Sequence, residues 1–166
     1  MNLIDDKPER KGLYSRFVKS EVMTKVFEKI LIATDGSEKN QPAVKKGLAL
    51  AREFGSTVYV VYVVDDVTIT SAEAGALIGD LYTTLNKEGE KALENAKQIA
   101  DGQKVETSIL SGRPAKVITE FAVKNKVDLI VVGSLGKTGL TRLVLGSVAE
   151  SILRMADCMV LVVKNK

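Results

Sequence analysis

The stretch Thr57-Val-Tyr-Val-Val-Tyr-Val-Val64 consists almost entirely of β-branched and aromatic residues. A run of this kind, without alternating polar positions, is typical of a strand that is buried on both faces. Such strands occur in parallel sheets, whose two faces are covered by helices. We therefore expect Thr57–Val64 to be a central strand of an α/β protein.

Patterns on either side of this stretch predict four further strands, at 29–34, 105–110, 127–132 and 159–163. Helical patterns lie between the strands, from about Val44 to a stop at Gly55, over 85–101, from Pro114 and over 147–155. Residues 66–84 resemble a connection. Strands separated by helices of this length pair in parallel through right-handed crossovers. The sequence predicts α/β architecture, with a single doubly wound five-stranded parallel sheet and helices on both faces.

The chain divides into an N-terminal extension, 1–27, and one domain, 28–166. With 166 residues it is long enough for one domain and too short for two. In the extension, Phe17, Val18 and Val22 recur at helical spacing, which predicts a short amphipathic helix. That helix would dock on the body or on a second subunit, or else bind a partner or a membrane surface.

Composition excludes several classes of function. The chain has no histidine, which excludes histidine acid/base catalysis and serine–histidine triads. It has 24 basic and 21 acidic residues and only 5% aromatic residues, so we expect no nucleic-acid partner. The apolar runs have the length of strands, and Asp5 and Asp6 lie where a signal peptide would be apolar. We expect no membrane span, and the single Cys158 suits a reducing, cytoplasmic location.

Two strand ends carry the residues that indicate a ligand. The first strand ends in Thr34-Asp35-Gly36-Ser37, and the fourth in Gly133-x2-Gly136-x9-Gly146-Ser147. Ligands of open α/β sheets bind beyond the carboxyl ends of strands, where the strand order reverses. Glycines let the backbone approach an anion, and a helix N-terminus favours one. The pattern is neither a P-loop nor a dinucleotide fingerprint, but it predicts a phosphate-bearing ligand.

These motifs together resemble the universal stress protein family, in its ATP-binding branch, over about residues 27 to 165. The resemblance implies strand order 3-2-1-4-5 and a homodimer formed through the fifth strand. It also implies ATP, or AMP or ADP, across the ends of the first and fourth strands, with Mg or Mn held mainly by phosphates and water. Members often have proline where Ala33 lies and histidine where Leu135 lies. The leucine removes a polar group from the rim of the loop.

The resemblance also assigns roles to individual residues. Asp35, beside Ala33 and Thr34, would hold the ribose or the adenine side, and Val63 would pack on adenine. Gly133 and Gly136, after Val132, would line the ribose and the first phosphates. The phosphates would bind the backbone amides and hydroxyl at the start of the last helix. The expected nucleotide-binding residues are Ala33, Thr34, Asp35, Val63, Val132, Gly133, Gly136, Lys137, Gly146, Ser147 and Val148.

Local structural roles would also account for several of these residues. Ser147 and Glu150 have the spacing of a capping box, with Ser147 as the N-cap. Asp35 would also suit the start of the following helix. Lys137 and Arg142 are as compatible with solvated loop charges as with phosphate contacts. The pair Asp65-Asp66 indicates a turn at a strand end rather than a metal site.

The sequence thus favours an ATP-binding regulatory module, in which nucleotide biases a conformation or an interaction with a still unknown protein partner. We expect no catalytic residue, and at most very slow ATP hydrolysis, because no general base is visible near the glycine loop. Two alternatives remain open. One is a slow ATPase or phosphoryl-transfer enzyme, and the other is a dimeric interaction scaffold without ATP.

Overall fold

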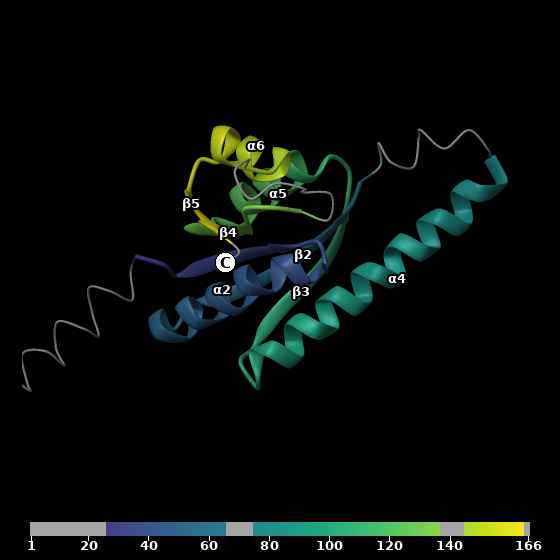
Figure 1. Cartoon of the computed structure of the whole chain (residues 1–166). Coiled ribbons are helices and arrows are strands. Elements are labelled where there is room, and N and C mark those ends of the chain that lie inside the picture. Colours follow the sequence, from purple (N-terminus) through teal and green to yellow (C-terminus); the bar gives the residue numbers. More distant parts are fainter. Residues whose placement is uncertain (1–25, 66–74, 137–144, 165–166) are drawn as a thin grey trace, which may run out of the picture.

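The computed structural model of the chain describes residues 26–65, 75–136 and 145–164. Its strands are β1 (Lys29–Thr34), β2 (Thr57–Val64), β3 (Val105–Ser111), β4 (Leu129–Gly133) and β5 (Met159–Val163). They form one parallel sheet in the order β3-β2-β1-β4-β5 (Figure 1). The predicted fold and strand order are therefore confirmed, and β3 and β5 form the two edges of the sheet. The helix predicted around Phe17 lies outside the described residues.

The helices form a layer on each face of the sheet. They are η2 (Glu38–Asn40), α2 (Gln41–Phe54), α4 (Gly75–Ala100), α5 (Pro114–Asn125) and α6 (Ser147–Met155). On one face α2 packs on β1 while α4 packs on β2 and β3, and on the other face α5 and α6 pack against each other. Figure 1 shows α4 running past the edge of the sheet.

The strand residues point alternately into two hydrophobic cores. Ile30 and Ile32 of β1 are fully buried in the core under α2 and α4. Leu31 and Ala33, at the positions between them, are buried in the core under α5 and α6. This two-sided burial is the reason why β1 is apolar at every position from Ile30 to Ala33.

The helix ends follow the expected signals at two places. Gly55 ends α2 in the left-handed conformation, with φ of 66°, which glycine adopts at little cost. Pro114 is the first residue of α5, where its missing N–H removes no hydrogen bond.

The helix α4 begins earlier than predicted. Residues 75–84, expected to belong to a connection, are its first turns. Leu81 and Leu85, four residues apart, both pack against the core under α2 and α4. The hydroxyls of Thr83 and Thr84 donate to the carbonyls of Gly79 and Asp80, each at 2.8 Å. The hydroxyls of these two threonines are therefore satisfied within the helix.

No helix within the described ranges is long and apolar enough to cross a membrane. The carboxyl ends of the parallel strands all meet at one edge of the sheet, and the candidate site lies there.

Candidate functional site

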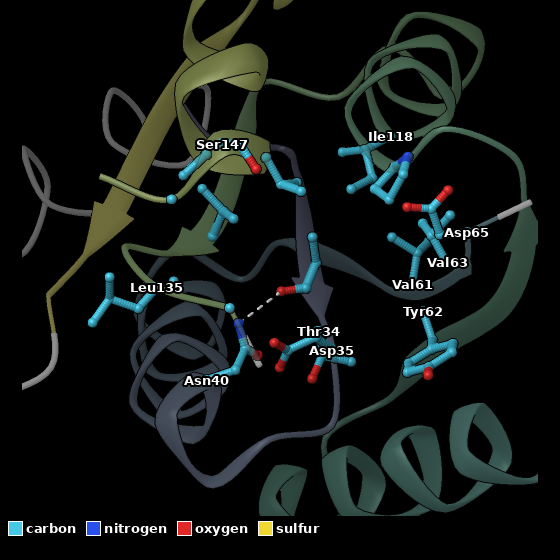
Figure 2. Close-up of a pocket in the computed structure, with 18 of the residues that line it drawn as sticks. Thr34, Asp35, Asn40, Val61, Tyr62, Val63, Asp65, Ile118, Leu135 and Ser147 are labelled. Carbon is cyan, nitrogen blue, oxygen red and sulfur yellow. Dashed lines mark hydrogen bonds between the residues drawn. The ribbon is translucent and has the colours of Figure 1, made fainter. Parts of the chain in front are cut away.

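A cavity of about 450 Å³ lies beyond the carboxyl ends of β1, β2 and β4 (Figure 2). Ten of the predicted nucleotide-binding residues line it, namely Ala33, Thr34, Asp35, Val63, Val132, Gly133, Gly136, Gly146, Ser147 and Val148. Lys137 and Arg142 lie outside the described residues. Residues separated by more than a hundred positions in the chain are thus gathered around a single space.

The cavity also has lining residues that the motifs did not indicate. They include Asn40, Val61, Tyr62, Asp65, Leu85, Pro114 and Ile118, and Leu135, expected at the rim of the glycine loop, lines the cavity as well. Val61 could have been predicted, because Val61 and Val63 are two residues apart in a strand and therefore point to the same face of the sheet. Others, such as Leu85 and Asn40, could not, since only the packing of their helices brings them to the cavity.

One side of the cavity is lined mainly by apolar side chains. Val61 and Ile118 are 1% and 3% exposed, and both belong to the core under α5 and α6, against which Val63 also packs. Figure 2 shows Ile118, Val63 and Asp65 grouped on the same side of the site. Apolar walls with a few polar groups are usual for a pocket that accepts a flat organic ring.

Asp35 lies at the turn after β1. Its Oδ1 accepts hydrogen bonds from the backbone N–H of Ser37 at 3.0 Å and from the Ser37 hydroxyl at 2.7 Å. One oxygen therefore shapes the turn before η2, but the N-cap of η2 is Ser37, so Asp35 does not itself begin the following helix as the local alternative expected. The other oxygen, Oδ2, is buried and has no partner among the described residues. A buried acceptor without a donor is costly, and a ligand donor would satisfy it.

Gly36 allows this turn. Its φ is +75°, in the region that residues with side chains rarely adopt, and its N–H donates to the Thr34 hydroxyl oxygen at 3.1 Å. A Cβ at this position would lie 2.9 Å from Cβ of Ala92 on α4. The Asp35 side chain thus owes its position to a turn that needs glycine.

The start of α6 faces the cavity with Gly146, Ser147 and Val148. The alternative of a capping box is wrong, because the N-cap is Gly146 and Ser147 is already in the helix. No side-chain cap is present, and Glu150 instead pairs with Arg154 at 2.8 Å. The first N–H groups of a helix lack intrahelical partners and carry a positive dipole end. This end of the cavity is therefore suited to an anion.

The three glycines of the motif have no positive φ, so the backbone conformation does not require glycine at any of them. Space accounts for two of them. A Cβ on Gly133 would lie 2.9 Å from Nδ2 of Asn40, and one on Gly146 would lie 3.3 Å from the Ser134 carbonyl oxygen. A Cβ on Gly136 would make only an ordinary contact, 3.5 Å from Asp35 Oδ2, within the described residues.

Two further features concern a metal site at Asp65-Asp66 and the single cysteine. The described residues contain no group of three or more histidine, cysteine or acidic side chains that would hold a metal ion, and Asp66 is not among them. Cys158 precedes β5, and burial raises the pKa of its thiol above the ordinary value.

Residues 27–164 match the Universal stress protein family. Universal stress protein MJ0531 of Methanocaldococcus jannaschii is 46% identical over 145 residues, which cover 84% of each chain. The chain belongs to the universal stress protein family.

Solved structures agree with this assignment. MJ0577 of M. jannaschii, a universal stress protein whose structure was described as a structure-based assignment of biochemical function, superposes with a TM-score of 0.74. It is 35% identical in that superposition, which covers 85% of this chain and 98% of that one. A universal stress protein from Archaeoglobus fulgidus, solved in complex with dAMP, has a TM-score of 0.60 at 23% identity and covers 84% of this chain and 99% of that one. At that identity the likeness shows the fold alone.

Proposed function

We propose that this universal stress protein is an ATP-binding regulatory module, in which nucleotide biases a conformation or the binding of a protein partner. The observation that carries the proposal is the cavity itself. An apolar side, a buried carboxylate oxygen without a partner and the start of a helix face one space. An adenine ring, a ribose and a chain of phosphates need these three environments.

Different residues of the cavity would bind different parts of the nucleotide. Val63, with Val61 and Ile118, would pack on adenine because these side chains belong to the apolar side. Asp35 Oδ2 would accept a hydrogen bond from a ribose hydroxyl, which would give a buried oxygen its missing donor.

The phosphates would lie against Gly146, Ser147 and Val148 at the start of α6. Gly136 would let the backbone approach them, since nothing else among the described residues needs a glycine there. Lys137 is included in the proposed site only because of its position in the sequence. A bound Mg or Mn would neutralise phosphate charge and would be held mainly by phosphates and water.

A homodimer through β5 is the second part of the proposal. This strand ends the sheet, and its outer edge would be an aggregation template if left bare. Three large apolar side chains on α6 and β5 are about half exposed, which suits a covered surface: Leu153 at 47%, Met155 at 48% and Met159 at 52%. A two-fold axis would let two copies cover each other, antiparallel at β5. We place the protein in the cytoplasm because its single cysteine suits a reducing compartment.

The experiment that tests the function is mass spectrometry of the small molecules released when freshly purified protein is denatured. The proposal expects an adenine nucleotide, in an amount approaching one per chain. Its absence from protein that also fails to bind added ATP would favour the interaction scaffold. Phosphate release that depends on the protein, at the pace of an ordinary enzyme, would favour the ATPase.

A further inference from the structure

The two strands that border the site separate before they end. Pairing of β1 with β4 runs from Ile30–Leu129 to Ile32–Val131. On their other sides the same strands stay paired to their ends, at Thr34–Tyr62 between β1 and β2 and at Gly133–Val163 between β4 and β5. A gap therefore opens between the last residues of β1 and β4, at the point where the strand order reverses.

Asn40 fills this gap from the start of α2. It is 4% exposed and lines the cavity, and its Nδ2 donates to the Ala33 carbonyl oxygen of β1 at 3.5 Å (Figure 2). On the other side, its Nδ2 and Cα lie 2.9 Å and 3.8 Å from the place of a Cβ on Gly133 of β4. The Asn40 side chain thus bonds to the end of β1 and occupies the space beside Gly133 at the end of β4.

Stability alone does not account for an asparagine at this place. Its Oδ1 is buried and has no hydrogen-bond partner among the described residues, which costs free energy that an apolar side chain would not. Gly133 needs no special backbone conformation, and the atom nearest to a Cβ there is Nδ2 of Asn40, with the Leu135 carbonyl oxygen next at 3.4 Å. The two residues fit each other as a pair.

We propose that Asn40 is a positioning residue that sets the opening between β1 and β4, and that position 133 is glycine to make room for it. The inference rests on the proposed function, because the opening it sets is the one in which the nucleotide would lie. It also changes the role of Gly133, which serves the asparagine rather than the phosphates.

The test is a double-mutant cycle with Asn40→Ala, Gly133→Ala and the chain that carries both. Free energy of unfolding is measured without nucleotide, and the Kd for ATP-magnesium is measured well below the unfolding temperature. Gly133→Ala alone should lower Tm by about 5 °C, because the new methyl group overlaps Asn40. It should also weaken binding about tenfold as Asn40 and the strand ends shift.

In the Asn40→Ala background, Gly133→Ala should raise the Kd by less than about twofold. It should also lower Tm by less than half of the loss that Gly133→Ala causes alone. Gly136→Ala is the matched control, since a Cβ there lies against Asp35 and not against Asn40, so its effects should add to those of Asn40→Ala. Asn40→Ala alone should weaken ATP binding, because the spacer between the strands is lost.

Equal costs of Gly133→Ala in both backgrounds would overturn the proposal and return the glycine to the nucleotide. If Gly133→Ala does not fold, folding of the double variant supports the pair, whereas failure of both variants overturns it. A chain that binds no nucleotide at all would refute the proposed function. The unfolding cycle would still decide whether Asn40 and Gly133 are coupled, and additive effects there would overturn this inference.

Discussion

Replacing Gly136 with alanine separates a ligand role from a structural one. A Cβ at this position would lie 3.5 Å from Asp35 Oδ2, an ordinary van der Waals distance, and the backbone φ is not in the left-handed region. The folded protein can therefore accept the methyl group among its described residues. A nucleotide that approaches the backbone at Gly136 could not, since the methyl group would occupy its place.

The two effects differ in size. The free energy of unfolding should change by less than about 1 kcal/mol, and towards greater stability, because alanine restricts the unfolded chain. Nucleotide binding should weaken by about 1.5–3 kcal/mol, the value of a hydrogen bond to a charged group. That loss corresponds to a rise in Kd of about 10- to 150-fold.

The assay is calorimetric titration with ATP-magnesium, combined with denaturant unfolding of the same protein preparations. Gly79→Ala is the control, because Gly79 lies on the exposed face of α4 with nothing within 4 Å of an added Cβ. It should leave the Kd unchanged. The reasoning is refuted if Gly136→Ala unfolds the protein, or if it binds ATP as tightly as the unsubstituted chain.

Three further outcomes are expected. Protein-dependent release of phosphate from ATP should be far slower than about 10 per second, the median rate for enzymes. If the protein released phosphate at that rate and Asp35→Ala abolished the release, the protein would be an enzyme instead. Light scattering should give a mass twice the 17.9 kDa of one chain, and a monomer mass for the unsubstituted protein would refute the dimer. Met159→Lys should weaken the dimer, whereas Tyr82→Lys, on α4, should not. Met159 suits this test because its side chain is half exposed, unlike that of Val162, which packs against the protomer's own core. Cys158 should react with iodoacetamide at pH 7.5 more slowly than glutathione does, because burial raises its pKa and less thiolate forms, and an equal or faster rate would contradict this.

The fold could be predicted because its signals are local and agree with one another. The apolar run of β2, the stop at Gly55 and the proline at the start of α5 each indicate the element in which they lie. The start of α4 could not be predicted from composition. Thr83 and Thr84 favour loops in general, and only the packing of Leu81 and Leu85 on the core decides for the helix.

The candidate site was predictable where its residues follow a strand in the chain, as Asp35 follows β1 and Gly136 follows β4. It was not predictable where tertiary packing brings a residue in from a helix, as with Ile118 and Asn40. The capping box failed for a related reason. The spacing of Ser147 and Glu150 fits the motif, but Ser147 is the first residue of the helix, whereas the motif requires it to be the N-cap.

The central claim is tested most directly by titrating the full chain with ATP-magnesium. Binding is measured by calorimetry, and stabilisation of the fold by thermal unfolding. We expect binding at one site per chain with a micromolar Kd. ATP at about a hundred times that Kd should stabilise the fold by about 2.7 kcal/mol and raise Tm by about 5–10 °C. Neither heat of binding nor any shift in Tm at millimolar ATP-magnesium would contradict the account.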